Sequence, residues 1–295
     1  VMGIVGAILS PVFLTTQNLL NILWTVSVLG IIALGQTLLL ITGNFDMSVA
    51  YIVGLSGITT VLSQLAGANL FISVLLGILA GVLVGLLNGT IIVLTKANAF
   101  LITLGTSTLV YSINLTLTQS KTWYASIDSF LILGQGKLFG TIHYSVLIFL
   151  FLALLLELVL RHTRFGRSLY IIGLNQRTGF LSGIKTNWIK LLTYLISGSM
   201  AALAGLIMTS RTGSTVANAG VGMEFDSMIA AVLGGTSLSG GKGSTLRTVV
   251  GVLILGVLNN LLVLLNVPYE AQQIAKGLVF LVVVMMDSNL QGKLR

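Results

Sequence analysis

Few side chains in this sequence have the chemistry of a catalyst. The chain has no cysteine, which excludes a thiol nucleophile, a disulfide and a cysteine-ligated metal site. Its two histidines, His143 and His162, have no neighbours at metal-ligand spacing. No nucleophile and base form a recognisable pair, so these residues disfavour an enzyme.

A glycine-rich run over residues 234–244 is similar in composition to a phosphate-binding loop. Such a loop needs a glycine, four residues, Gly-Lys and then Ser or Thr. Around Gly241-Lys242, however, Thr236 stands where the first glycine is required, and Gly243 stands where the hydroxyl is required. We therefore expect this chain to bind no ATP phosphates, and we expect the run to break a helix where other helices pack against its open backbone.

Two aspartates share a sequence context. Asp46 and Asp226 each follow a phenylalanine just before an apolar stretch. Asp46 either caps the helix that follows or takes part in a solute pathway or gate, because charges inside a membrane are expensive and usually functional. The same alternatives apply to Glu224 and Asp226.

The other charges inside apolar stretches have simpler interpretations. Glu157 precedes Arg161 by four residues, which predicts an ion pair at a helix end. Lys276 is expected to reach the membrane surface by snorkelling. The sequence has no clustered acid pair and no Asp–His chain of the kind that couples transport to protons or sodium. This absence weakens the case for a secondary transporter.

Uncharged polar side chains are frequent near the two aspartates. A channel lined by them would pass a neutral, hydroxyl-rich solute without a charged site, although each side chain alone is more often an interhelical hydrogen bond. The candidates for the pathway are Asp46, Asp226 and the uncharged residues Asn44, Asn88, Thr103, Thr106 and Asn218, with Asn259 and Asn260 also nearby.

The elements that must position these residues are membrane helices. Of the 295 residues, 55% are hydrophobic and 7% are charged, with a mean hydropathy of +1.04, whereas soluble domains carry about 25% charged residues. This composition excludes a cytosolic enzyme, a secreted domain and a disordered chain. The net charge of +8 is explained by the basic residues that cytoplasmic loops of membrane proteins carry. The sequence lacks a basic stripe with interleaved aromatic residues, so nucleic-acid binding is disfavoured.

Polar punctuation divides the sequence into apolar spans of helical length. The piece at 227–240 is short and ends in glycines, so it predicts a broken helix. Residues 1–14 resemble the end of a further helix, so Val1 is not expected to be the natural start, and a secretory signal peptide is disfavoured. The spans lie near 18–42, 47–65, 70–95, 98–118, 143–160, 190–210, 227–240, 246–266 and 270–287.

Basic residues predict the orientation of these spans. Six lie between residues 161 and 190 with no acidic residue among them, so the positive-inside rule places this segment in the cytoplasm. Counting crossings from there, we expect the C-terminus, Lys96 and the N-terminus inside, and the 119–142 segment outside.

Two halves of the chain are weakly similar. Besides the two Phe-Asp pairs, Gly85-Leu86-Leu87-Asn88 resembles Gly256-Val257-Leu258-Asn259. Each half supplies four spans, and the single span at 143–160 separates them, so the halves would have opposite orientations, as in many transporters. Chance recurrence of Gly, Ala and Leu is the alternative.

A glycine face within the first half predicts close packing, inside the subunit or at a dimer seam, through Gly77, Gly81, Gly85 and Gly89.

The basic segment is long enough to hold structure of its own. Residues 175–184 predict a short helix with Asn175 as its N-cap. A partner protein could bind this helix on the cytoplasmic side. The alternative is an interfacial helix that touches only anionic lipid.

Several motifs extend in order over almost the whole chain. They are Thr42–Val49, Thr103–Thr106, Thr163–Arg167, Gly173–Asn175, Leu181–Ile184, Asn218–Asp226 and Val232–Ser244. On these motifs the chain resembles permease subunits of bacterial ATP-binding-cassette importers of the ribose and monosaccharide type.

The resemblance implies a fold and a set of partners. The fold would be an all-α polytopic membrane protein of about ten transmembrane helices in two inverted four-helix repeats, similar to the cobalamin importer. It would form one permease domain over 1–295, with repeat one at about 18–118, the linking helix at 143–160, the coupling segment at 161–190 and repeat two at about 190–287. Two permeases, identical or paralogous, would assemble with two ATPase subunits or one tandem ATPase and a periplasmic binding protein in the bacterial inner membrane.

The resemblance also implies roles for segments. ATP and Mg would bind the partner ATPases, with no cofactor in this chain. Alternating access would move a small neutral sugar or sugar-like solute, delivered by the binding protein, inward. The binding protein would contact 119–142 and the loops near 67–69, 211–224 and 267–270. An ATP-independent transporter or channel is the competing interpretation. The ATPase would contact Gly173, Asn175, Arg177, Gly179, Leu181, Ser182, Gly183 and Ile184, although Gln176-Arg177-Thr178-Gly179 departs from the small residues usual there.

Overall fold

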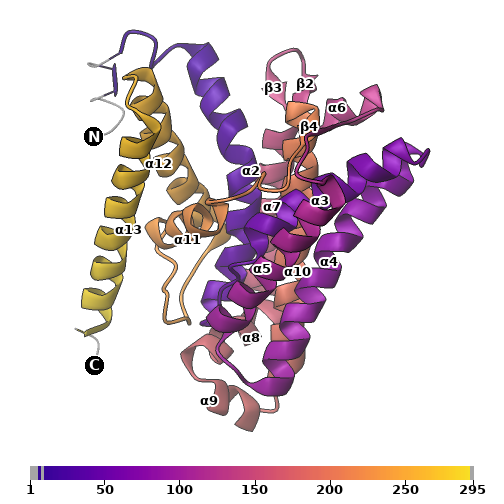
Figure 1. Ribbon diagram of the computed structural model, residues 1–295. Helices are drawn as coiled ribbons and strands as arrows, with labels where there is room; N and C mark the ends of the chain where they lie inside the picture. The colour runs from indigo at the N-terminus through magenta and orange to yellow at the C-terminus, as the bar shows by residue number, and fades with distance from the viewer. Residues whose placement is uncertain (1–5, 8–9, 293–295) are drawn as a thin grey trace.

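The computed structural model describes residues 6–7 and 10–292, and this part of the chain is mainly helical (Figure 1). Six helices are long and apolar enough to cross a membrane. Their bounds follow the predicted spans within a few residues, because hydropathy and polar punctuation fix where a membrane helix can lie. They are α2 (Thr16–Ile41), α4 (Leu70–Thr95), α5 (Ala99–Thr118), α7 (Tyr144–His162), α10 (Thr186–Thr212) and α12 (Thr245–Leu264).

Three further helices occupy the other predicted spans. The α3 helix (Val49–Leu65) is apolar but has 17 residues, and α13 (Tyr269–Gly292) has 24 residues. The α11 helix (Met223–Leu233) is short, as expected, but it begins four residues before the predicted piece at 227–240 and ends seven residues before its end. The shift arises because Gly222 has a left-handed backbone that starts the helix, and Gly234 stops it. Most of the helix end expected over 1–14 lies outside the described residues.

The connections contain short helices and strands, of which the sequence analysis predicted only the helix after Asn175. Between α5 and α7 lie α6 (Asp128–Gln135) and the antiparallel pair β2 (Lys137–Leu138) and β3 (Ile142–His143). In addition, β1 (Trp123–Tyr124) pairs with β4 (Ser214–Thr215). At the opposite end of the molecule, α8 (Arg164–Leu174) and α9 (Gln176–Leu181) follow α7 (Figure 1).

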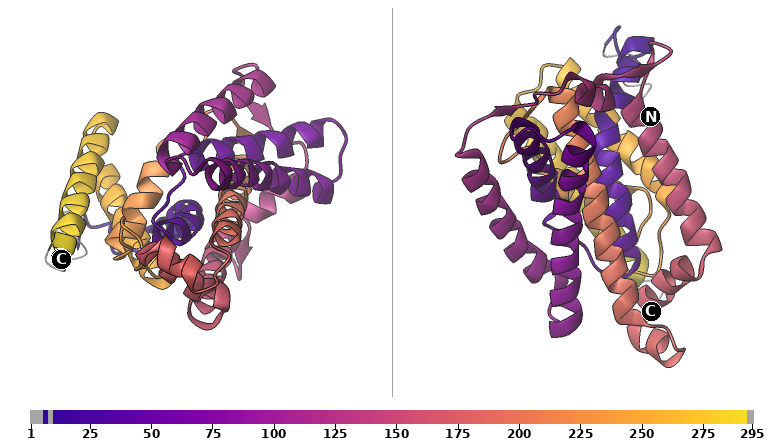
Figure 2. Two further views of the ribbon diagram at one scale, coloured as in Figure 1. Left: turned by 90° about the horizontal axis from the view of Figure 1, so that it is seen from below. Right: turned by 90° about the vertical axis from the view of Figure 1, so that its right-hand side faces the viewer.

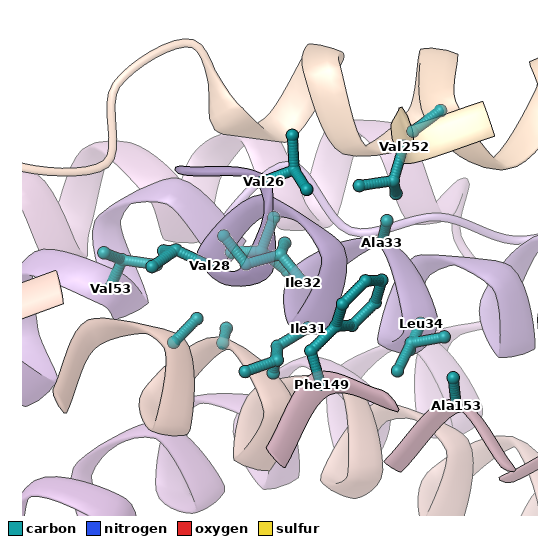
Figure 3. Close-up of a cluster of buried hydrophobic side chains, with 14 of the residues drawn as sticks. Val26, Val28, Ile31, Ile32, Ala33, Leu34, Val53, Phe149, Ala153 and Val252 are labelled. Atoms are coloured by element: carbon teal, nitrogen blue, oxygen red, sulfur yellow. The ribbon is translucent and has the colours of Figure 1, made fainter. Parts of the chain in front are cut away.

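The α2 helix is the centre of the fold. It packs against α7, α10, α11 and α12, and Figure 2 shows it between α11–α13 on one side and α3, α4, α5 and α10 on the other. Its apolar side chains from Val26 to Leu34 meet Phe149 and Ala153 of α7 and Val252 of α12 (Figure 3). Gly30 makes room for the Phe149 ring, which a Cβ at that position would contact.

The predicted glycine face lies on α4 and is confirmed, and it packs within the subunit. A Cβ at Gly81 would lie 2.6 Å from the Gly198 carbonyl oxygen, and a Cβ at Gly85 would lie 2.5 Å from the Tyr194 carbonyl oxygen. Gly77 packs on Ser56 and Gly89 on Tyr194. The α4 backbone therefore approaches α10 and α3 closely, as expected where lipid gives helices no hydrophobic reason to associate.

Candidate functional site

The segment between α2 and α3 buries Asp46 in a polar cluster. Its Oδ1 accepts hydrogen bonds from the Ser48 backbone N–H (2.8 Å) and the Ser48 hydroxyl (2.6 Å). The Gln36 amide bonds both the N–H (3.1 Å) and the C=O (2.6 Å) of Asp46. The Asn88 Nδ2 lies 2.9 Å from the Ser48 hydroxyl and 3.4 Å from both carboxylate oxygens. The carboxylate therefore holds the turn that begins α3.

Other predicted pathway residues join this cluster or lie beside it. The Thr103 hydroxyl accepts from the Met47 N–H (3.1 Å) and is buried. Thr106 is also buried, but its hydroxyl donates to the Ile102 carbonyl of its own helix (3.0 Å). The half-buried Asn44 amide donates to the Thr42 carbonyl (3.1 Å). The structure thus gathers Asp46, Asn88 and Thr103, while Asn44 and Thr106 make local bonds.

Asp226 of the second half has different surroundings. Its Oδ2 lies 2.8 Å from the Nζ of Lys276, and both side chains are 18% exposed. This ion pair joins α11 to α13 and corrects the expectation that Lys276 reaches the membrane surface by snorkelling. The sequence analysis missed it because the two residues are 50 positions apart. The pair leaves this intramembrane site with no net charge.

Asp226 also lines a cavity of about 320 Å³ between α2, α11 and α12. Asn260 closes one side through paired amide hydrogen bonds with Asn18 (3.0 and 2.8 Å). The buried Oδ1 of Asn259 has no hydrogen-bond partner among residues 6–7 and 10–292. The wall contains carboxamides, a hydroxyl and apolar groups, and its members include Asn21, Ile22, Thr25, Val26, Leu29, Met223, Asp226, Gly256, Asn259, Asn260 and Val263.

Asn218 does not line this cavity and is exposed. Its neighbourhood is held instead by Asn114, which the sequence analysis missed. The buried Asn114 amide donates to the carbonyls of Tyr51 (3.0 Å) and Ala217 (3.2 Å). It therefore ties α5 to α3 and to the segment before α11. A polar residue inside an apolar span was the available signal for Asn114.

The short helix predicted after Asn175 is present as α9. The Asn175 side chain accepts from the N–H groups of Arg177 (2.9 Å) and Thr178 (3.1 Å), which confirms the N-cap. Phe180 and Leu181 are 69% and 76% exposed. The tip of the molecule therefore presents apolar side chains together with the exposed Arg177, a pattern that fits a protein contact.

Two predicted contact residues are used for packing inside the subunit. Gly173 lies against the Ile41 carbonyl and the Gly241 backbone, and the Gly241 N–H donates to the Ile41 carbonyl (2.9 Å). Gly179 is buried against Ile172 and Thr186. The glycine-rich run 234–244 thus packs backbone to backbone against the ends of α2 and α8, as expected. Arg177, Leu181, Ser182 and Gly183 are exposed, and Ile184 is partly exposed.

The fold and this site define a class: a polytopic membrane permease with a polar cavity between its helices. The sequence profile described as branched-chain amino acid transport system, permease component, matches residues 18–284. The chain belongs to this family. It forms the membrane-spanning part of a transport system and is not an enzyme.

Individual relatives match nearly the whole chain. The ribose import permease protein of Bacillus subtilis (strain 168) is 38% identical over 97% of this chain and 89% of its own length. The D-allose transport system permease protein of Escherichia coli (strain K12) is 33% identical over 97% and 88%. The L-arabinose transport system permease protein of the same strain is 34% identical over 99% and 88%. No solved structure matches the chain significantly.

Proposed function

We propose that this chain is the membrane-spanning subunit of an ATP-driven importer for a small neutral sugar. The observation that carries the proposal is the near full-length similarity to permeases named for ribose, D-allose and L-arabinose. All three of these solutes are uncharged monosaccharides. The family profile is named for branched-chain amino acids, so the relatives, more than the family, indicate the solute.

The chemistry of the cavity supports a neutral solute. Its volume of about 320 Å³ is within the range of small-molecule sites, which is roughly 300–1,000 Å³. Carboxamides such as Asn259 donate and accept hydrogen bonds, which suits hydroxyl groups. Because Lys276 neutralises Asp226, the wall offers no net charge to attract an ion. The pathway would run from this cavity past the Asp46 cluster, including Asn44, Asn88, Thr103 and Thr106.

The packing of the helices supports two inverted repeats. In the first half α3 packs on α4 and α5, and in the second half α11 packs on α12 and α13. The first helix of each half packs against the other half. The α10 helix of the second half packs on α3 and α4, and the α2 helix of the first half packs on α11 and α12. This reciprocal packing is what a two-fold relation between halves would produce. With the helix end at 1–14, the subunit would have ten helices and a fold similar to the cobalamin importer.

The ends of the molecule support the assignment of partners. The basic residues near α8 and α9 favour the cytoplasm for that end, so the exposed tip of α9 would seat on an ATPase subunit. The opposite end, with α6, β2 and β3, would face a periplasmic binding protein. A second permease subunit would complete the pathway, and the C-terminus would be cytoplasmic.

Uptake by proteoliposomes tests the proposed solute. The chain would be reconstituted with its ATPase and binding protein, and internal radiolabel would be measured for ribose, allose, arabinose and leucine. We expect ATP-dependent accumulation of at least one sugar and none of leucine. Accumulation of leucine without any of the sugars would contradict the proposal.

A further inference from the structure

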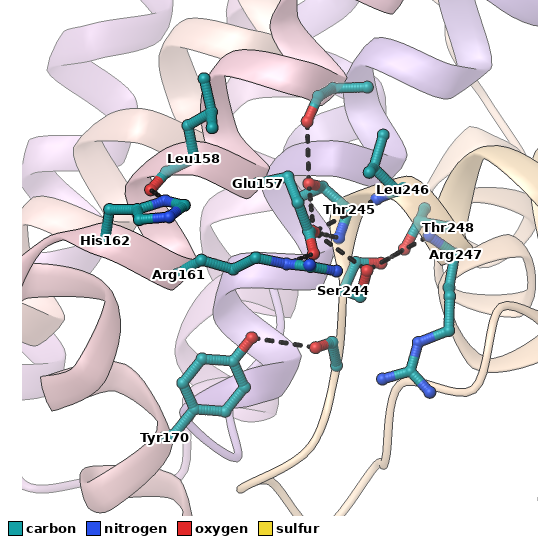
Figure 4. Close-up of polar contacts among 12 residues, drawn as sticks. Glu157, Leu158, Arg161, His162, Tyr170, Ser244, Thr245, Leu246, Arg247 and Thr248 are labelled. Atoms are coloured by element: carbon teal, nitrogen blue, oxygen red, sulfur yellow. Dashed lines mark hydrogen bonds and ion pairs between the residues drawn. The ribbon is translucent and has the colours of Figure 1, made fainter.

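A basic pocket lies where α7 ends and α12 begins. It has a volume of about 380 Å³ and is lined by Glu157, Arg161, Tyr170, Lys242, Ser244 and Arg247, together with nearby glycines. Figure 4 shows Arg161, Tyr170 and Arg247, which belong to three different helices, on either side of the loop that precedes α12. This pocket is separate from the cavity beside Asp226.

The one acid among the lining residues is already occupied by other bonds. Glu157 Oε1 lies 2.7 Å from Arg161 Nε. Its Oε2 accepts from the Ser244 hydroxyl (2.9 Å), the Thr245 N–H (2.8 Å) and the Thr245 hydroxyl (3.0 Å) (Figure 4). Glu157 therefore caps the N-terminus of α12 and balances a single arginine.

The remaining cations of the pocket have no carboxylate partner in the part of the chain that the structure describes. The two ion pairs found there are Arg161–Glu157 and Lys276–Asp226. Lys242 and Arg247 are exposed at the pocket. The site thus carries three cations against one carboxylate, which is an excess of two positive charges.

The pocket adjoins an apolar surface at the level where the membrane spans end. Arg161 is in the last turn of α7, and Arg247 is in the first turn of α12. On the same two helices, exposed apolar side chains lie in pairs four residues apart. They are Leu154 and Leu158 on α7, and Leu246 and Val250 on α12. Acyl chains cover such a surface in a bilayer.

We propose that this pocket binds the phosphate headgroup of an anionic phospholipid, with its acyl chains along the exposed leucines and valine of α7 and α12. Arginine pairs with phosphate oxygens through parallel N–H bonds, and basic pockets between membrane helices are suited to anionic headgroups. The ligand would bridge α7, the 234–244 run and α12.

The Tyr170 hydroxyl places α8 in the same junction. It donates to the Gly243 carbonyl (2.9 Å), and burial raises the pKa of the phenol, which keeps it protonated as a donor. A bound headgroup would therefore stabilise the contact between α8, which leads into α9, and the start of α12. This inference depends on the membrane location of the chain and not on the identity of its solute.

Lipid retention in native mass spectrometry tests the site. Purified protein would be incubated with phosphatidylglycerol or phosphatidylcholine and compared with Lys242→Gln/Arg247→Gln. The matched control is Lys96→Gln/Lys185→Gln, which removes two exposed cations outside the pocket. We expect the wild type and the control to retain phosphatidylglycerol preferentially, and the pocket variant to lose on the order of tenfold in retention.

Three results would overturn the proposal. Equal losses in the pocket variant and the control would show that retention reflects overall charge. Inorganic phosphate that displaces the lipid and raises the melting temperature as much as lipid does would identify a free-anion site. Unchanged lipid retention with a loss of ATPase co-purification in the pocket variant would assign these cations to a protein interface.

Discussion

Asp46 and Asp226 follow phenylalanine in similar contexts, yet their carboxylates are satisfied in different ways. Asp46 is fully buried and bonded by Ser48 and by Asn88. Asp226 pairs with Lys276 at the wall of an open cavity. The first arrangement fixes a turn, whereas the second leaves polar groups facing a space that a solute could fill. We therefore expect sensitivity to charge at Asp226 and sensitivity to packing at Asp46.

The charge balance between Asp226 and Lys276 is testable by a double-mutant cycle. Lys276→Met leaves a partly buried carboxylate without its cation, and Asp226→Asn leaves the lysine unpaired. We expect each single change to reduce uptake by about tenfold or more, and the double change to restore it to within about threefold of wild type. Lys96→Met, at an exposed loop, is the control. Additive losses in the double variant would show that pairing is not what matters.

His143 predicts a pH dependence of stability. It stacks on Trp24 with ring centroids 4.1 Å apart, and burial, reinforced by the nearby charge of Lys137, lowers its pKa below 6.5. As the pH falls below about 6.5, the unfolded chain therefore binds the proton before the folded protein does, and the free energy of unfolding decreases until the folded pKa is passed. Above this range the contribution is complete.

Thermal unfolding in detergent between pH 5 and pH 8 checks this dependence, since histidine titrates in that range. We expect His143→Gln to flatten the profile and the matched change at the exposed His162 to leave it unaltered. A profile that flattens only with the His162 variant would assign the dependence to the other histidine.

Among the elements, the contact of α4 with α10 depends on missing side chains. A Cβ at Gly85 would lie 2.5 Å from the Tyr194 carbonyl oxygen, so Gly85→Ala forces two backbones apart. We expect this change to destabilise the protein by about 1–3 kcal/mol, measured as a lower melting temperature. Gly105→Ala on α5 is the control, because its added Cβ would meet no atom within 4 Å in the described residues outside its own stretch of helix. Equal melting temperatures for both variants would contradict the packing assignment.

The α9 helix is the element on which coupling depends in this account. Phe180→Asp/Leu181→Asp places charges on its exposed apolar tip while leaving the Asn175 cap intact. We expect co-purification of the ATPase to fall at least about fivefold. Phe139→Asp, at a residue 92% exposed at the opposite end, should have no effect. Normal co-purification of the α9 variant would place the ATPase contact elsewhere.

The elements that were predicted well from the sequence are those that one local property defines, such as hydropathy or a capping side chain. Hydropathy located the spans, and a side-chain cap located α9 at Asn175. The α8 and α6 helices were missed because they are short and partly polar, which hydropathy does not distinguish from a loop. The Lys276–Asp226 pair and the Asn114 bonds depend on tertiary contacts between distant segments, and no local pattern encodes them.

For the whole molecule, the helices form two groups around α2. One group contains α3, α4, α5 and α10, and the other contains α11, α12 and α13 (Figure 2). The backbone contacts of Gly173 and Gly241 join the second group to α8 and hence to α9. A push on α9 could therefore reach the segment before α12 through close-packed backbone. Under the proposed function, this route would give an external ATPase a mechanical connection to the cavity.

Sugar uptake with an inactive ATPase partner tests the central claim most directly. Proteoliposomes would contain this chain, its ATPase partner and the binding protein, with the ATPase either intact or changed at its catalytic residue. The account predicts that ATP drives accumulation of sugar only with the intact ATPase and that the inactive assembly stays at the background of empty vesicles. Accumulation that persists with the inactive ATPase would contradict it and would identify a secondary transporter or a channel.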